Sequence, residues 1–157
     1  MSEPVFSTFT QATTPTHEVT LDFDQRRKRR QAIATDRGPA WIDLERLERP
    51  FVDGDLLASS DGLTLCIHAR AERLIEVRAD GATLTRCAFH LGNRHAQVEV
   101  VEAGLRTPED PVMRQMLEQL GAEVVVVDAP FRPEIGAYHH EHDHAHGPAK
   151  IHRFVLK

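Results

Sequence analysis

The stretch EDPVMRQMLEQLGAEVVVVDAPF, residues 109–131, decides the fold of the carboxy-terminal half of the chain. Asp110 predicts a helix start, because an aspartate at this position accepts hydrogen bonds from the free N–H groups of the first turn. Pro111 fits the first helical position, and Gly121 is typical of the residue that follows a helix end. The helix is therefore expected between Pro111 and Gly121.

The apolar residues of this stretch predict one buried helix face and one buried strand. The apolar line expected on the helix consists of Val112, Met116 and Leu120, flanked by Met113 and Leu117. The run AEVVVVDAPF that follows, residues 122–131, is almost continuously apolar. Such a run is typical of a strand in the middle of a sheet, where both faces are covered.

The residues before this stretch predict the rest of one domain over residues 74–134. RLIEVRA, residues 73–79, predicts a strand, and GATLTRCAFHLGN, residues 81–93, predicts a helix. AQVEVVEAGLRT, residues 96–107, predicts a hairpin that turns at Ala103 and Gly104. The resulting order is β-α-β-β-α-β, which is a ferredoxin-like arrangement.

Residues 1–73 predict a small β-rich domain. Residues 1–16 are rich in Ser, Thr and Pro and predict a loose start with one edge strand at most. HEVTLDF then places Val19, Leu21 and Phe23 on one face of a strand, and the turn signals DRGPA, DGD and SDG separate further short apolar runs. The predicted fold class is therefore α+β, with a flexible His-rich tail at residues 135–157.

Composition excludes several classes of protein. The chain has 157 residues, 41% of them hydrophobic, and a formal net charge of −5, which does not favour a general nucleic-acid binder. No run of apolar residues is long enough to span a membrane, and the first residues lack the basic start and apolar centre of an export signal. We therefore expect a cytoplasmic protein whose Cys66 and Cys87 are thiols.

The tail YHHEHDHAHG, residues 138–147, carries five of the ten histidines of the chain. These candidate metal ligands are His139, His140, His142, His144 and His146. Imidazole suits nickel, copper and zinc, and the chain has no cysteine-rich site that would favour copper(I) or structural zinc. Metal binding by the tail is the favoured interpretation, and a solvated polar tail is the structural alternative.

A second histidine pair lies in FHLGNRHAQ. A zinc protease requires H-E-x-x-H, whereas His90 and His95 are five residues apart, with a helix-breaking Gly92-Asn93 and no carboxylate between them. One such histidine cannot form a tight site alone, but two copies related by a two-fold axis can each contribute one. The alternative for His90 is a packed or hydrogen-bonded histidine at a helix end, and His95 has a comparable structural alternative.

Two further features have simpler explanations. The basic run RRKRR, residues 26–30, predicts a solvated strand face, with a protein-docking patch as the alternative and nucleic-acid binding disfavoured. Cys87 lies three residues before His90, where a buried thiol in the helix core is expected. The chain has no G-x-x-x-x-G-K-[ST] stretch and no arrangement of catalytic residues, which predicts a protein that is not an enzyme.

Several of these stretches resemble the UreE family of urease accessory proteins. The similar stretches, which fall within residues 17–147, are HLGNRH, EDPVMRQMLEQLGAEV, PFRPEIGAYHHEHDHAHG and, more diffusely, RRKRR and DGDLLASSDGLTLCIHARAERLIEV. The resemblance implies a homodimeric nickel(II) chaperone that delivers the metal through a UreG-like GTPase to the urease apoprotein and its accessory complex. It also implies a nickel ligand at His95 and further ligands among residues 139–146, with zinc(II) or copper(II) as alternative metals in vitro.

One departure from the family and two rival functions remain. Some family members carry an extra histidine pair where this chain reads RTPEDPV, so a site there is not expected. A metal storage or buffering protein would need only the tail and would not depend on His95. A metal-dependent hydrolase would need three fixed ligands and a general base.

Overall fold

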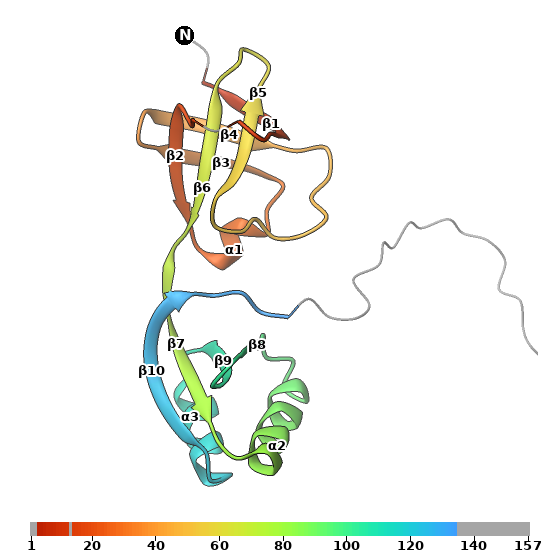
Figure 1. The fold of residues 1–157 in the computed structure, drawn as a ribbon, viewed down its shortest axis with the longest axis vertical. Helices are drawn as coiled ribbons and strands as arrows, with labels where there is room; N and C mark the ends of the chain where they lie inside the picture. Colours follow the sequence, from red (N-terminus) through yellow and green to blue (C-terminus); the bar gives the residue numbers. More distant parts are fainter. Residues whose placement is uncertain (1–2, 13, 135–157) are drawn as a thin grey trace, which may run out of the picture.

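The computed structural model describes residues 3–12 and 14–134, which form two β-sheets (Figure 1). The part of the chain before Ala71 builds the first sheet, and the part from Ala71 onward builds the second; we call these parts the first and second domains. Strand β7 (Ala71–Arg78) follows β6 (Thr64–Ala69) directly and carries the chain from one sheet to the other. The predicted His-rich tail lies outside the described residues.

The first domain is a six-stranded sheet in the order β2-β6-β5-β1-β4-β3. Besides β6, its strands are β1 (Val5–Phe9), β2 (His17–Leu21), β3 (Arg30–Thr35), β4 (Gly38–Asp43) and β5 (Asp55–Ser59). The pairs β1–β4 and β2–β6 are parallel, and the others are antiparallel. The Asp36 N–H donates a hydrogen bond of 3.1 Å to the Glu18 carbonyl, so the two outer strands approach each other and the sheet curls around its core.

Alternating residues of these strands fill one hydrophobic core, as period-two patterns predict. The buried members are Phe6, Val19, Leu21, Ile33, Ala40, Ile42, Leu44, Phe51, Leu57, Leu65 and Ile67. The expectation of a loose start with an edge strand is wrong. Strand β1 lies inside the sheet between β5 and β4, and its Phe6 side chain is fully buried in the core, whereas Val5 and Phe9 are partly exposed.

The short helix α1 (Phe23–Arg26) corrects the prediction that Phe23 continues the strand of Val19 and Leu21. Asp22 accepts a hydrogen bond from the Gln25 N–H, and the Gln25 side chain accepts one from the Asp22 N–H. This reciprocal capping box starts a helix where the apolar alternation alone suggests a longer strand. Phe23 is still buried, but at the junction between the domains instead of in the first core.

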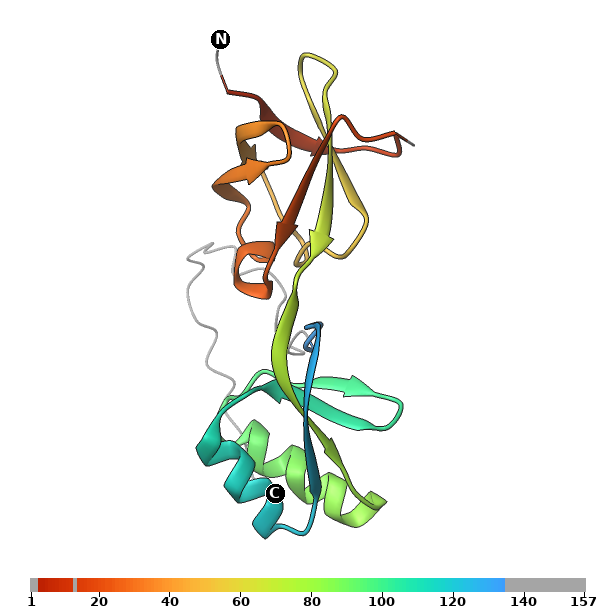
Figure 2. The ribbon, with the colours of Figure 1, turned by 90° about the vertical axis from the view of Figure 1, so that its left-hand side faces the viewer.

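The second domain has the element order β-α-β-β-α-β and an antiparallel sheet in the order β10-β7-β9-β8. After β7 come α2 (Gly81–Gly92), β8 (Glu99–Val101), β9 (Gly104–Pro108), α3 (Pro111–Gln119) and β10 (Glu123–Pro130). Both helices lie on one face of the sheet (Figure 2). Ile75 and Val77 of β7 share a buried core with Cys87 and Leu91 of α2 and with Leu117 of α3.

Two details of this domain differ from the sequence-based expectation. Strand β10 is an edge strand that pairs only with β7, although its apolar run predicts the middle of a sheet. Its inward side chains pack on the helices, and its partly buried outward side chains account for the continuous run. Val112 is 72% exposed, because the buried face of α3 is centred on Leu117 and not on the expected line through Val112.

The β8–β9 hairpin depends on a glycine. Gly104 has a φ of +149°, and a Cβ atom added there would lie 2.0 Å from the Val77 carbonyl oxygen. The backbone of β9 therefore approaches β7 too closely for any side chain. The predicted hairpin is confirmed, but its turn consists of Glu102 and Ala103, one residue earlier than the predicted Ala103 and Gly104.

A buried carboxylate lies on the face of the second sheet opposite the helices. Glu76 is 3% exposed, and its two oxygens accept hydrogen bonds from the side chains of Arg78 and Arg106, with Nε–O distances of 2.8 Å in both cases. The two guanidinium groups lower the pKa of Glu76, because they donate hydrogen bonds to its charged form. The carboxylate is thus held charged beneath two arginines.

The two domains meet around Arg26. Its side chain is 1% exposed and donates hydrogen bonds to the carbonyls of Phe51, at 3.0 Å, and Phe131, at 2.5 Å. Phe23 and Phe131 pack edge to face at 5.4 Å and share a small core with Leu74. The prediction that RRKRR forms a solvated strand face is therefore only partly right: residues 27–30 are exposed, but only Arg30 belongs to a strand, and Arg26 is buried.

Candidate metal site

Helix α2 and the turn that follows it carry the two central histidines, His90 and His95. Asp80 caps the helix by accepting a hydrogen bond of 2.9 Å from the Thr83 N–H. Cys87 and Leu91 are fully buried, which fixes the rotation of the helix on the sheet and confirms Cys87 as a core thiol. The helix ends at Gly92, so His90 is its last-turn histidine and His95 lies beyond it.

His95 has an unusual backbone conformation. Its φ is 54°, and no other residue apart from glycine has a positive φ within residues 3–12 and 14–134. The turn is held by hydrogen bonds from the His95 N–H to the Gly92 carbonyl, at 2.9 Å, and from the Ala96 N–H to the Leu91 carbonyl, at 3.1 Å. The imidazole is thus presented from an exposed turn, and such left-handed residues concentrate at functional sites.

His90 has a different environment from His95. It is partly buried, and its ring packs edge to face on Phe89 at 5.5 Å. Its backbone carbonyl accepts a hydrogen bond of 3.2 Å from Arg94. These contacts agree with the structural alternative of a packed histidine at a helix end.

The segment that leads into the tail lies beside the segment that follows His95. The Glu134 N–H donates a hydrogen bond of 2.8 Å to the carbonyl of Val98, three residues after His95. The Arg132 N–H also contacts the Glu99 carboxylate at 3.4 Å. The last described residue is therefore anchored close to the His95 turn. The predicted tail ligands His139, His140, His142, His144 and His146 lie outside the described residues.

The described residues do not by themselves assemble a complete metal site. Among residues 3–12 and 14–134, no three His, Cys, Asp or Glu side chains lie close enough together to hold an ion. Both cysteines are free, and burial raises the pKa of each thiol, so neither is disposed to bind metal as a thiolate. Any site that uses His95 therefore needs ligands from the tail or from a second copy of the chain.

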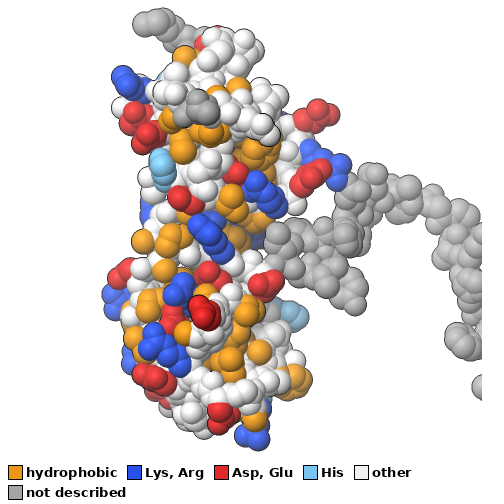
Figure 3. All heavy atoms as spheres, viewed as in Figure 1, with side chains coloured by type: hydrophobic (Ala, Val, Ile, Leu, Met, Phe, Trp, Pro, Cys, Tyr) orange, Lys and Arg blue, Asp and Glu red, His pale blue; other side chains and the backbone are white. Residues whose placement is uncertain are grey.

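Apolar side chains are exposed on both sides of His95 in the sequence. Phe89 of α2 is 64% exposed and Val100 of β8 is 61% exposed. In the space-filling view, hydrophobic side chains gather on the second domain below the point where the described chain ends (Figure 3). The sequence patterns predict only the helix and the hairpin that contain Phe89 and Val100, and they give no sign that these two side chains are exposed.

Sequence reasoning also missed Arg26. The run RRKRR itself gives no sign that its first member is buried. The sequence feature that matters is the capping box of Asp22 and Gln25, which places Arg26 in a helix turned toward the second domain. Reading Asp22 as a helix cap would have separated Arg26 from the exposed arginines that follow it.

Comparisons with known proteins define the class. The model of the amino-terminal domain of the UreE urease accessory protein matches residues 7–80, and the model of its carboxy-terminal domain matches residues 72–153. A urease accessory protein UreE of Azotobacter vinelandii is 42% identical over 149 residues, which cover 89% of this chain and 90% of that protein. One of Nitrosococcus oceani is 41% identical over 147 residues, which cover 87% and 88%.

These matches identify the molecule as an accessory protein rather than a catalyst. The chain belongs to the UreE family of urease accessory proteins. The predicted resemblance and the prediction of a non-enzymatic protein are thereby confirmed. None of the helices in the described part of the chain is long and apolar enough to cross a membrane.

Proposed function

We propose that this protein is a cytoplasmic nickel(II) metallochaperone that delivers nickel for maturation of the urease active site. The observation that carries the proposal is the hydrogen bond from the Glu134 N–H to the Val98 carbonyl. It starts the histidine tail beside the turn of His95, so tail imidazoles can reach an ion held there. Membership of a family of urease accessory proteins supports the choice of urease as the destination.

The proposed ligands are His95, His139, His140, His142, His144 and His146. His95 is exposed, and its turn is fixed by two backbone hydrogen bonds, so it can bind an ion without reorganising the fold. Imidazole ligands suit nickel(II) and would also accept zinc(II) or copper(II) in vitro. An open site of this kind releases its ion by ligand exchange, because a partner can replace one imidazole at a time.

The proposal includes a homodimer that pairs through the second domain. A two-fold interface would bring both copies of His95 to one ion. The exposure of Phe89 and Val100 on either side of His95 supports this face, since exposed apolar groups of this size favour association. A UreG-like GTPase and the urease apoprotein complex are the proposed recipients, because this chain has no phosphate-binding loop of its own.

The proposal also includes the domain organisation: a β-rich domain of residues 1–73, a ferredoxin-like domain of residues 74–134 and a flexible His-rich tail of residues 135–157. The element order β-α-β-β-α-β and the strand order β10-β7-β9-β8 support the ferredoxin-like assignment.

The test is nickel titration by calorimetry of the intact protein beside a form that ends at Ala137, with the mass of each measured in solution. We expect both forms to be dimers and to bind a first nickel ion, and the intact form to bind more ions and to bind the first more tightly. Adding apo-urease and its accessory proteins should then produce active urease more efficiently with the intact form. A monomeric intact protein, or urease activation that is indifferent to it, would contradict the proposal.

The same titration separates delivery from storage. A storage protein needs only the tail, so it predicts no tight nickel binding at all in the form that ends at Ala137. The proposed chaperone retains binding at His95 in that form, because the dimer supplies two imidazoles.

A further inference from the structure

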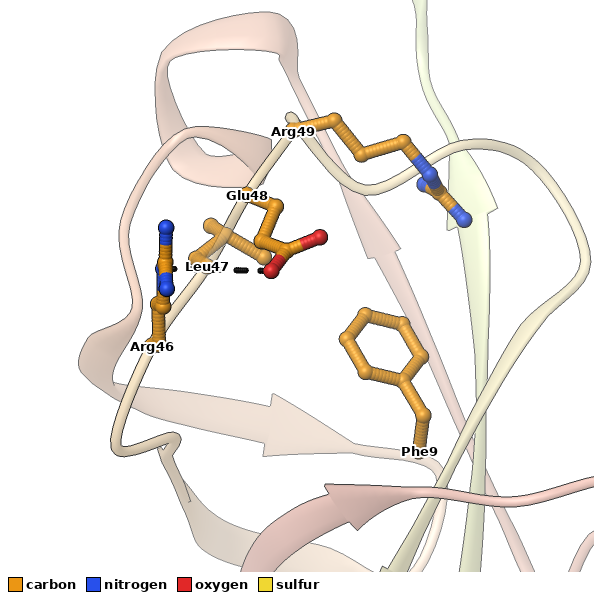
Figure 4. A pocket seen from close by; sticks show the side chains of 5 residues that line it. All are labelled: Phe9, Arg46, Leu47, Glu48 and Arg49. Atoms are coloured by element: carbon orange, nitrogen blue, oxygen red, sulfur yellow. Dashed lines mark ion pairs between the residues drawn. The ribbon is translucent and has the colours of Figure 1, made fainter. Parts of the chain in front are cut away.

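Hollows that the proposed metal site does not use lie around residues 46–50 of the first domain. The wider hollow, of about 370 Å³, is lined by Phe9 and by residues 46–49 (Figure 4). A smaller one, of about 100 Å³, lies where the two domains meet, and we call it the junction hollow. Its lining includes Phe23, Arg26, Arg49, Phe51, Val52 and Arg132.

The wider hollow has balanced charges. Arg46 and Glu48 form an ion pair at 3.8 Å, drawn as the dashed line in Figure 4. Asp55 accepts two hydrogen bonds from Arg49, at 2.8 and 2.9 Å, and the Arg49 guanidinium also lies 5.8 Å from the Phe9 ring. Its cations are therefore already matched by carboxylates of the first domain.

The junction hollow has one cation more than it has matched carboxylates. Arg26 lies 3.8 Å from Glu72, and Arg49 is paired with Asp55. Arg132 is exposed, and within the described parts of the chain its guanidinium has no ion-pair or hydrogen-bond partner. The junction hollow therefore has room for one further negative charge.

Arg26 adds to this imbalance. Its Nε atom is buried and has no hydrogen-bond partner among the described residues. Its pKa is lowered, first by burial and then, against the opposing pull of Glu72, by the positive charge of Arg132. A carboxylate beside Arg132 would offset the repulsion between these two guanidinium groups.

The walls of the junction hollow restrict the ligand further. Phe23, Pro50, Phe51, Val52 and Pro133 surround the arginines, and the volume corresponds to roughly three water molecules. The hollow therefore has room for one carboxylate-bearing side chain. Arginine suits this role, because its planar guanidinium can donate two hydrogen bonds to one carboxylate.

We propose that the junction hollow binds a carboxylate of this chain's own tail, from Glu141 or Asp143. These are the acidic side chains of residues 135–157, and they lie among the proposed histidine ligands. Arg132 and Pro133 line the hollow itself, so the tail starts at its rim.

The short connection makes this contact effective although a single exposed ion pair is weak. A tether of this length keeps the carboxylates at an effective concentration on the order of millimolar, so even a contact with a millimolar dissociation constant is about half occupied. The chain from Arg132 to Glu141 can also reach the hollow easily, since an extended chain covers about 3.3 Å per residue. An acidic segment of another protein would have to be supplied at a comparable concentration.

Docking holds the histidines on either side of Glu141 and Asp143 next to the His95 turn before metal arrives. This consequence rests on the proposed function, whereas the contact itself does not depend on nickel.

The test uses the full-length, metal-free protein in the presence of a chelator, with amide and arginine side-chain NMR signals as the readout. The double variant Glu141→Gln/Asp143→Asn is compared with the parent chain. We expect signals of Val52, Arg132 and Glu134 to move in the variant, and salt at about 0.5 M to move the parent signals toward the same positions. The matched control Lys150→Gln changes the charge of the tail by one unit and should leave these signals in place.

A charge exchange tests the pairing directly. Arg132→Glu should abolish the salt-dependent shifts, and combining it with Glu141→Arg/Asp143→Arg should restore them. The proposal is overturned if the junction signals are the same in the parent and in Glu141→Gln/Asp143→Asn. It is also overturned if the shifts disappear on dilution, which would assign the contact to the tail of a second copy. Because no nickel is present, neither outcome bears on nickel delivery.

Discussion

The two domains bury their apolar residues in different ways. The first domain curls a six-stranded sheet around its own core, and every one of its strands contributes core residues. The second domain lays two helices on one face of a four-stranded sheet and leaves Phe89, Val100 and Val112 more than half exposed. The exposed large apolar side chains of the first domain, such as Phe9 and Trp41, are all less than half exposed, so the most exposed apolar groups lie on the second domain.

The difference also concerns charge. In the second domain the buried Glu76 is matched by two arginines on its own sheet. The buried Arg26 of the first domain is matched mainly by carbonyls, one of which belongs to Phe131 of the other domain. One hydrogen-bond acceptor of the buried Arg26 side chain is therefore supplied by the second domain.

The largest expected effect separates the two cores. Leu117→Ala should destabilise the second domain by about 2–5 kcal/mol, because Leu117 is fully buried between helix and sheet. Trp41, the single tryptophan, lies in the first domain, so its fluorescence should still report the parent transition on denaturation. Leu57→Ala is the matched change in the first core. It should lower the denaturation midpoint that Trp41 fluorescence reports, by an amount that corresponds to a similar loss of stability. If both variants lowered the denaturation midpoint of the Trp41 signal equally, the two domains would unfold as one unit.

The next effect tests the buried carboxylate. Glu76→Gln should cost about 1–2 kcal/mol at pH 7, less than a fully buried pair would, because Arg78 and Arg106 are partly exposed. The folded-state pKa of Glu76 is lowered. The contribution of Glu76 to the free energy of unfolding is therefore present above the ordinary glutamate pKa and is lost as the pH falls below it.

The difference in the free energy of unfolding between the parent and Glu76→Gln, measured by urea denaturation, should therefore shrink between about pH 5 and pH 3. Glu118→Gln is the control, since Glu118 pairs with Arg114 on the exposed surface of α3 and should cost less than about 0.5 kcal/mol. A difference that stays constant down to pH 3 would contradict the role given to Glu76.

A smaller effect is expected at His95, and it falls on binding instead of stability. His95→Asn should weaken the tightest nickel binding by about 10-fold or more, because one of a few ligands is lost. Asparagine tolerates a φ near the 54° observed at this position, so the free energy of unfolding should change little. His90→Asn is the control for nickel calorimetry and should leave the first binding step unchanged. Equal affinity in the parent and His95→Asn would exclude His95 as a ligand.

The smallest effect is expected on removal of the tail. The form that ends at Ala137 keeps every described strand and helix, so its apo melting temperature should match that of the intact protein to within about 2 °C. A large drop, measured by calorimetric scanning, would mean that residues beyond Ala137 pack as structure.

Sequence patterns predicted the second domain well where local signals were strong. Asp110, Pro111 and Gly121 mark the ends of α3 as expected, and the β8–β9 hairpin is confirmed with its turn one residue earlier than predicted. The position of β10 at the sheet edge could not be predicted from its apolar run, because periodicity does not report which neighbour a strand pairs with. Val112 was misplaced because several apolar residues of α3 compete for one face, and packing in the core shared with the sheet and α2 decides which is buried.

The candidate site was predictable only in part. HLGNRH drew attention to His95, but its left-handed backbone has no signal in the sequence, since histidine adopts that conformation only occasionally. The anchoring of Glu134 on Val98 depends on the way β10 returns along β7, which is a tertiary feature. The burial of Arg26 likewise depends on a carbonyl that lies 105 residues away in the chain.

The pairing of β7 with β10 also has a mechanical consequence. Ala71, at the entrance to the second domain, is the register partner of Pro130, at its exit. A pull between the first domain and the tail would therefore load the same end of this strand pair and open it one hydrogen bond at a time, like a zipper, instead of shearing all of its bonds together. Tension on the tail should break the contacts of Glu134 and Phe131 first, then open the β7–β10 ladder, and leave the curled sheet of the first domain intact.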